Sequence, residues 1–223
     1  MSYNFDFEGL LPYWDQFAEG VWLTIQLSVA ATIAGFVLGT LCAIARTGGS
    51  AILKAFVGAY VDIIRNTPLL VQLFIIYFGA PQFGLDLSPF MSGLLGLSLN
   101  VGAYNAETIR AGILAIPRGQ IEASRSLGFS SGKTMRLIVL PQGIKLIMPP
   151  LGNNLVVLIK DTSLVSTITL AELFMKTQQL VGATFRPFEL YFACALIYAL
   201  LTTIVSQILQ WIERRLHTRG GRS

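Results

Sequence analysis

The sequence predicts an all-α membrane protein with five transmembrane helices, its N-terminus outside the membrane and its C-terminus in the cytoplasm. Hydrophobic residues make up 53% of the 223 residues and charged residues only 13%, whereas roughly a quarter of the residues in an ordinary soluble domain are charged. The hydrophobic residues form stretches about long enough to cross a ~30 Å hydrocarbon core. Most of the 16 lysines and arginines lie on one side of this arrangement, which is therefore expected to be cytoplasmic.

The basic residues on the predicted cytoplasmic side are Arg46, Lys54, Arg65, Arg110, Arg118, Arg125, Lys133, Arg136, Lys145, Arg214, Arg215, Arg219 and Arg222. Lys176 and Arg186 lie on the outer side, and Lys160 lies within a span. This distribution supports the predicted orientation.

The chain begins with an acidic, aromatic-rich segment, residues 1–20, which suits the outer membrane interface and lacks the features of a cleavable signal peptide. The first predicted span covers residues 21–45. Its Gly35 and Gly39 lie one helical turn apart and form a small-residue pair, which lets another helix approach closely.

The second predicted span, residues 55–79, is interrupted near its inner end by Pro68. A proline there kinks the helix and frees a backbone carbonyl, which we expect neighbouring helices to satisfy. The remaining predicted spans cover residues 90–116, 146–170 and 190–211, and Lys160–Ser163 interrupts the fourth. An external loop over residues 172–189 is expected before the fifth span, and residues 1–223 form a single transmembrane domain.

A charged helical hairpin, residues 120–141, is predicted between the third and fourth spans. Residues 120–127 favour a short helix, and Gly128 follows at the point where a positive φ would close it. Ser130 is a candidate N-cap for a second helix that ends at Pro141. The same composition also fits an ordinary basic cytoplasmic loop.

The sequence gives little support to enzyme, metal or nucleotide chemistry. The segment Gly128–Thr134 resembles a phosphate-binding loop, but its glycines are too close together and a helix rather than a strand precedes it. Cys42 and Cys194 lie in apolar stretches, which favours buried, inert thiols. The only histidine, His217, lies in the basic tail. We therefore expect no catalytic residue, no metal ligand, no cofactor and no nucleic-acid partner for this chain.

Polar residues inside the third and fourth spans are candidates for a binding site. Ionisable groups at the bilayer centre cost about 2.5–3.5 kcal/mol and usually face an interior cavity. Asn100, Tyr104 and Glu107 share one helical face, and Asn154 and Asp161 share another. The two faces could line one cavity for a free amino acid, with Asp161 or Glu107 holding the ammonium group and the asparagines forming hydrogen bonds.

Structural roles are the alternative for both carboxylates. Glu107 could pair only with Arg110, one helical turn later, and Asp161 could hold Lys160 or cap a broken helix. Adjacent residues on a regular helix do not face each other, so a pair between Lys160 and Asp161 requires the helix to unwind there.

The hairpin resembles the EAA motif of the permease subunits of bacterial ATP-binding-cassette (ABC) importers. The resemblance is carried by Glu122, Ala123, Gly128, Ile138, Leu140 and Pro141. In that family the hairpin is the coupling helix, which seats in a groove of the ATPase subunit. The resemblance implies coupling to the ATPase through Glu122, Ala123, Ser124, Arg125 and Gly128, with Ser124 standing where the family has a second alanine.

Further segments look like those of the polar amino-acid permeases, of the histidine, glutamine, arginine and cystine types. They are Arg65–Leu70 followed by Gln72, Ala103-Tyr104 with Glu107, Leu151–Asn154, and Lys160–Leu164. Together with the hairpin they cover nearly the whole chain. The basic amino-acid permeases of the family are expected to carry a carboxylate where Asn154 stands, so the neutral amide argues against a strictly cationic substrate.

The resemblance implies the type I ABC importer permease fold and a multi-pass subunit that moves polar amino acids across the bacterial inner membrane. It also implies a homodimer or a pair with a similar permease, two ATPase subunits that bind ATP and Mg, and a periplasmic or lipid-anchored amino-acid-binding protein. The chain itself would not be an enzyme. The alternative is an ion-coupled carrier or channel that works without an ATPase and uses Glu107 and Asp161 as ion sites.

Overall fold

The structure, a computed structural model, describes the backbone of residues 6–218 and the side chains of residues 6–215. This part of the chain is helical, without a β-strand. Its α-helices are α1 (Trp14–Gly48), α2 (Ala51–Arg65), α3 (Leu69–Gly79), α4 (Pro89–Leu114), α5 (Arg118–Ser126), α6 (Ser131–Thr134), α7 (Leu140–Asp161), α8 (Leu173–Thr184) and α9 (Pro187–Thr218). The other helical turns are η1 (Glu8–Tyr13), η2 (Ala80–Phe83) and η4 (Thr162–Ile168), which are 3₁₀ helices, and η3 (Met135–Val139), which is a π-helix. Arg219 and Arg222 of the basic tail lie outside the described residues.

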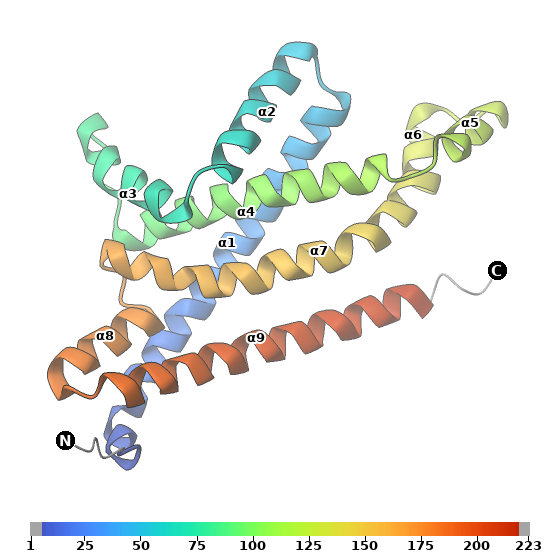
Figure 1. The fold of residues 1–223 in the computed structure, drawn as a ribbon. Coiled ribbons are helices and arrows are strands. Elements are labelled where there is room, and N and C mark those ends of the chain that lie inside the picture. The colour runs from blue at the N-terminus through green and yellow to red at the C-terminus, as the bar shows by residue number, and fades with distance from the viewer. Residues whose placement is uncertain (1–5, 219–223) are drawn as a thin grey trace.

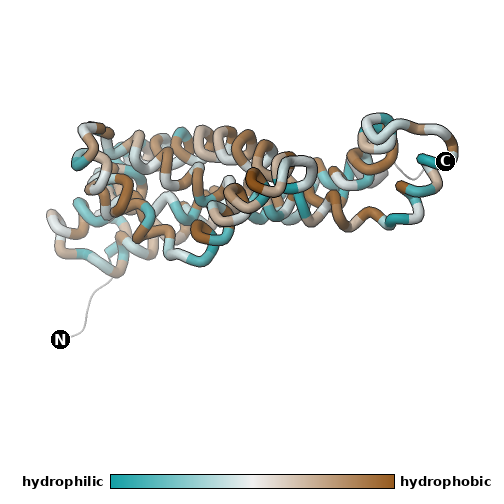
Figure 2. Tube along the Cα trace, turned by 90° about the horizontal axis from the view of Figure 1, so that it is seen from above, coloured by the Kyte–Doolittle hydropathy of each residue, from teal (hydrophilic) through white to brown (hydrophobic). Residues whose placement is uncertain are grey.

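Helices α4, α7 and α9 run roughly along one axis of the molecule (Figure 1). α4 and α7 lie side by side, α9 packs against α7, and α1 crosses the bundle and packs against α4. The N-terminal turn η1 and helix α8 lie at one end, whereas the α5–α6 hairpin and the C-terminal end of α9 lie at the other. Hydrophobic residues follow the bundle along its length (Figure 2).

The contact between α1 and α4 is close because it is built on glycine. A Cβ atom added to Gly35 would lie 3.1 Å from the carbonyl oxygen of Ser98, and one added to Gly39 would lie 2.9 Å from that of Gly102. Real Cβ atoms are rarely this close to backbone atoms, so only glycine allows the two helices to approach as they do. The predicted close approach at this pair is confirmed, and α4 is the helix that approaches.

By length and hydropathy, two helical segments of the described chain could each cross a membrane, Glu8–Gly48 and Pro187–Arg215. Two bent pairs could each form one more span, α2 with the segment Leu69–Phe83, bent by 107°, and Ser131–Ile168 with α8, bent by 51°. α4 is not among these candidates, although it has 26 residues. The predicted interruption of the second span is confirmed, since α2 ends at Arg65 and α3 begins at Leu69.

At the end of the molecule that holds α8, helical structure extends beyond the predicted spans. The first helix begins at Trp14 rather than at residue 21, and part of the predicted loop 172–189 forms α8. Phe17 of α1 and Leu173 of α8 are both buried in one hydrophobic cluster. Apolar burial between segments distant in sequence thus stabilises both helices at this end.

The second helix of the hairpin does not end at Pro141. α6, η3 and α7 follow one another without a break from Ser131 to Asp161. A proline ring inside a helix normally clashes with the carbonyl four residues earlier. Here the π-helical turn η3 widens the helix just before Pro141, which makes room for the ring.

Candidate functional site

A cavity of about 400 Å³ lies between the break of α2 and α3, helix α4 and helix α7. Because it is lined by three asparagine side chains, we call it the amide cavity. Its lining residues are Thr67, Pro68, Leu69, Asn100, Val101, Tyr104, Asn153, Asn154, Val157, Leu158 and Asp161. Four of the five residues predicted to form a binding site, Asn100, Tyr104, Asn154 and Asp161, therefore lie around one cavity.

The sequence reasoning did not place the α2–α3 break in the wall of this cavity. Thr67, Pro68 and Leu69 form that wall. The proline that breaks the span could have indicated this wall, because irregular backbone at membrane depth is tolerated only where protein or a cavity surrounds it. An interruption such as Pro68 inside an apolar span is thus itself a pointer to a cavity.

The side-chain amide of Gln72 satisfies the backbone groups that the break exposes. Its Nε2 donates to the carbonyl oxygen of Ile64 at 2.8 Å and to that of Thr67 at 3.1 Å. Its Oε1 accepts a hydrogen bond from Nδ2 of Asn100 on α4, at 3.1 Å. The freed carbonyls are therefore bonded within the broken span itself, and the neighbouring helix contributes only by holding Gln72.

Asn154 and Asp161 both line the amide cavity from α7, but only the Asn154 side chain forms a hydrogen bond with another described residue. Asn154 Nδ2 donates to Oδ1 of Asn105 on α4 at 3.0 Å, and so ties the two helices together. Asp161 is the last residue of α7, and the chain continues directly into η4. Within the described residues its carboxylate forms no hydrogen bond and no ion pair, with Lys160 or any other residue.

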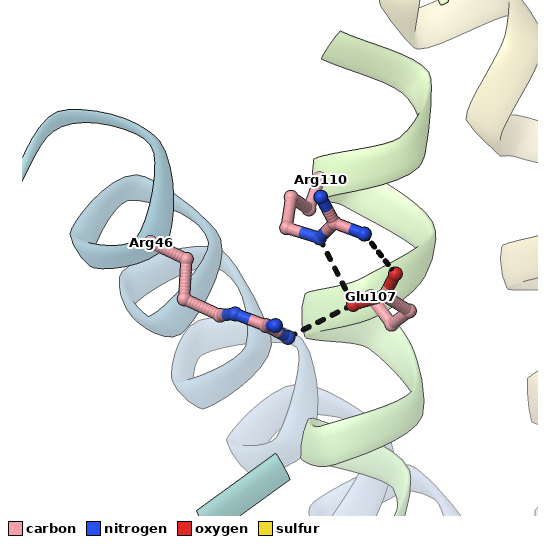
Figure 3. A network of polar contacts seen from close by, with 3 residues as sticks. All are labelled: Arg46, Glu107 and Arg110. Carbon is pink, nitrogen blue, oxygen red and sulfur yellow. Dashed lines mark hydrogen bonds and ion pairs between the residues drawn. The ribbon is translucent and has the colours of Figure 1, made fainter. Parts of the chain in front are cut away.

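Glu107 lies in a second cavity, not in the amide cavity. This second cavity, of about 410 Å³, has Arg65 in its wall, and we call it the arginine cavity. Glu107 Oε2 accepts a hydrogen bond from Nη1 of Arg46 on α1 at 2.9 Å and from Nε of Arg110 at 3.0 Å, and its Oε1 binds Nη2 of Arg110 (Figure 3). Glu107 thus joins α1 to α4 through its ion pair with Arg46. It also forms the ion pair with Arg110 that was one of the two alternatives left open by the sequence.

The hairpin closes through the backbone of Gly128, whose φ is 80°. The N–H of Gly128 donates to the carbonyl of Arg125 at 2.9 Å, and that of Phe129 donates to Ser124 at 3.1 Å. These two bonds form the Schellman motif that ends a helix at glycine. The Ser130 side chain accepts a hydrogen bond from the N–H of Lys133 and caps α6 as predicted.

The predicted coupling residues divide between the surface and the interior of the hairpin. Glu122, Ala123, Arg125 and Gly128 are exposed. Ser124 is only 4% exposed, and its Oγ lies 2.8 Å from Oγ1 of Thr134 in a buried hydrogen bond between α5 and α6. Its side chain therefore holds the hairpin together and is not available on the hairpin surface.

The part of the chain that the structure describes contains no candidate metal site, and its two cysteines are buried. No group of three or more histidine, cysteine, aspartate or glutamate residues lies there in an arrangement that could hold a metal ion. Cys42 and Cys194 are free and buried, as predicted for inert thiols.

A helical membrane protein with polar cavities along a broken span and an exposed hairpin at one end has the architecture of a membrane transport component. Residues 35–218 match the model of the family described as binding-protein-dependent transport system inner membrane component, and the chain belongs to that family. The family resemblance inferred from the hairpin is thereby confirmed.

Curated relatives match over nearly the whole chain. The chain is 42% identical over 205 residues to an L-cystine transport system permease protein of Bacillus subtilis (strain 168), covering 92% of this chain and 88% of the relative. It is 37% identical over 215 residues to a glutamine transport system permease protein of Escherichia coli (strain K12), covering 96% and 98%.

Solved structures share the fold. A crystal structure of an amino acid ABC transporter with histidines contains a chain that is 38% identical, with a TM-score of 0.91 over 96% of this chain and 100% of that chain. A chain of the MetNI methionine ABC transporter, 22% identical, has a TM-score of 0.76 over 92% and 98%, which shows the fold alone. The chain thus has the type I ABC importer permease fold. It is an inner-membrane transport component and not an enzyme, because ATPase activity in these transporters lies in separate subunits.

Proposed function

We propose that this chain is the permease subunit of an ABC importer that moves polar amino acids across the bacterial inner membrane. The curated relatives and the solved amino acid transporter support this substrate class, since they are similar to this chain over nearly its full length. The chain would form a homodimer or pair with a similar permease. Two ATPase subunits, which bind ATP and Mg, and a periplasmic or lipid-anchored binding protein would complete the importer.

The observation that carries the proposal is the unpaired carboxylate of Asp161 in the amide cavity. An amino acid presents an ammonium group, for which Asp161 is the partner, and a carboxylate. Helix α3 begins at Leu69 in the wall of the same cavity, and no side chain caps it. The first N–H groups of a helix lack partners within the helix and attract anions, so they suit the substrate carboxylate.

The amides around this cavity suit a polar and uncharged substrate side chain. Asn153 is exposed, and Asn100 and Asn154 each keep hydrogen-bonding groups beyond the bonds they make to Gln72 and Asn105. A side chain with donors and acceptors of its own can bind these groups. A long apolar side chain would leave them unpaired, which disfavours it.

Five spans with the N-terminus outside and the C-terminus in the cytoplasm fit this function. The four candidates found by length and hydropathy are joined by α4, whose 26 residues span about 39 Å at 1.5 Å per residue. An odd number of spans agrees with η1 and the end of α9 lying at opposite ends of the molecule. The hairpin then lies on the side of the C-terminus, where an ATPase subunit can reach Glu122, Ala123 and Arg125.

Reconstitution tests the proposal. Vesicles that contain the permease, its ATPase subunits and its binding protein should accumulate radiolabelled glutamine or cystine only when ATP is supplied on the ATPase side. Vesicles that contain the permease alone should not accumulate either substrate. Accumulation by the permease alone, driven by an ion gradient, would contradict the proposal and support the ion-coupled carrier.

A further inference from the structure

Tyr104 is the one aromatic residue that lines both cavities. Its ring belongs to α4, and the guanidinium carbon of Arg65 lies 5.4 Å from the ring centroid. A cation at this distance from an aromatic face is held by electrostatic attraction to the ring. We propose that Tyr104 and Arg65 form a partition that separates the amide cavity from the arginine cavity and blocks passage of substrate between them. This inference rests on the proposed function.

The partition is built from two elements that can move apart. Tyr104 stands on α4, a regular helix packed against α1 and α7. Arg65 is the last residue of α2, at the break, and its side chain lines the arginine cavity, while Pro68 and Leu69 beyond the break line the amide cavity. A shift of the break relative to α4 would therefore separate Arg65 from the ring and join the two cavities.

The Arg65 side chain has a second possible partner, Glu107, when it leaves the ring of Tyr104. Glu107 lines the same arginine cavity, and the two side chains attract each other. Glu107 already binds Arg46 and Arg110, so its carboxylate stays in position without Arg65. Arg65 is thus a positioning residue that either holds Tyr104 or turns towards Glu107.

A chain of hydrogen bonds links the amide cavity to the break that carries Arg65. Asn100 lies one helical turn before Tyr104 and donates to Gln72, which in turn donates to the carbonyl of Ile64, the neighbour of Arg65. A substrate carboxylate that binds both N–H groups of the Asn100 amide would turn this amide away from Gln72 and break the hydrogen bond between them. The break would then lose its only hydrogen bond from the Asn100 side chain, which favours release of the partition when substrate is present.

Passive leakage is the measurement that separates a partition from a purely structural contact. The complete importer is reconstituted in vesicles loaded with radiolabelled glutamine, and exit is followed without ATP. Tyr104→Ala should raise the exit rate by about two- to fivefold, the factor expected when one solvent-exposed cation–π contact is lost from a barrier. Tyr104→Phe keeps the ring beneath the guanidinium, so exit should stay slow whatever happens to uptake. Tyr191→Ala removes an exposed ring from α9 and serves as the control for the loss of a tyrosine.

Arg65 provides the second test, which does not require Tyr104→Ala to fold. Arg65→Gln should also raise passive exit, and Arg65→Lys should restore most of the barrier because it restores the cation. The partition is overturned if exit stays at the unaltered rate in both Tyr104→Ala and Arg65→Gln, or if Tyr104→Phe leaks as fast as Tyr104→Ala. ATP-driven uptake by the unaltered importer is measured separately, so a failure of the proposed function is seen there and not in the leak.

Discussion

Replacing Gly128 by valine should weaken the association of this chain with its ATPase subunits. The φ of Gly128 is 80°, in the left-handed region, and an ordinary L-residue pays roughly 1–2 kcal/mol to adopt that region. A β-branched residue such as valine is especially strained there. A Cβ atom added at this position would meet nothing within 4 Å. The cost is therefore entirely a backbone cost, and it is borne by the turn between α5 and α6.

This energy converts directly into an expected loss of binding. If only the closed turn presents the hairpin correctly, a penalty of 1–2 kcal/mol lowers the ratio of closed to open turn by a factor of about 5–30, and binding of the ATPase weakens by up to that factor. The assay is co-purification of the ATPase subunits with the tagged permease from membranes, followed by ATP-driven uptake in vesicles. Both should fall in parallel while the amount of inserted permease stays constant.

Two variants control for the size of the new side chain. Gly132→Val adds the same atoms in α6, where they also meet nothing within 4 Å and where φ is not positive. Gly128→Asn introduces a residue that tolerates the left-handed region. Both should retain the ATPase. Normal co-purification and uptake with Gly128→Val, or an equal loss with Gly132→Val, would refute the reasoning that the turn conformation presents the hairpin.

Three other predictions follow from the helix packing, the amide cavity and the external contacts. Gly39→Ala places a Cβ against the backbone of α4, 2.9 Å from a carbonyl oxygen, and should destabilise the protein by about 1–3 kcal/mol, seen as a lower melting temperature in detergent. Asp161→Asn removes the ammonium partner and should raise the KM for uptake about tenfold or more without lowering the melting temperature, since a hydrogen bond to a charged group contributes about 1.5–3 kcal/mol. The pKa of Asp6 lies below its ordinary value of 3.8, first because the N–H of Gly9 donates to its carboxylate and then because Arg186 binds it. A lowered pKa stabilises the contact above pH 3.8 and withdraws that stabilisation as the pH falls below it. The protection of the Gly9 N–H from hydrogen exchange, taken relative to the intrinsic exchange rate at each pH, should therefore be lost only below that pH.

Local chemistry predicted the breaks and turns of the fold. Pro68 cannot donate a backbone hydrogen bond, Gly128 alone accepts a positive φ without strain, and Ser130 can cap the helix that follows it. Each of these effects depends on a few neighbouring residues, so the sequence contains it directly. The cluster that buries Phe17 of α1 and Leu173 of α8 instead joins residues that lie far apart in the sequence.

The candidate site was predictable to the same extent. Helical periodicity placed Asn100 and Tyr104 on one face, and the structure shows that face lining a cavity. The same periodicity included Glu107, but that residue lies one turn further along α4 and enters the neighbouring cavity, among arginines from other elements. Likewise, the bonds of Gln72 and Ser124 depend on partners that only tertiary packing brings within reach.

The uninterrupted course of the chain from Ser131 to Asp161 has a mechanical consequence. No flexible linker separates the exposed elbow of this protein from the helix that carries Asn154 and Asp161 to the cavity. A force applied at α6 is therefore delivered along a continuous helical rod of about 45 Å, at 1.5 Å per residue. Pro149 and Pro150 interrupt its hydrogen-bond ladder farther along, and the π-helical turn changes its pitch near the base. Tilting of the rod at the π-helical turn would displace Asp161 at its far end.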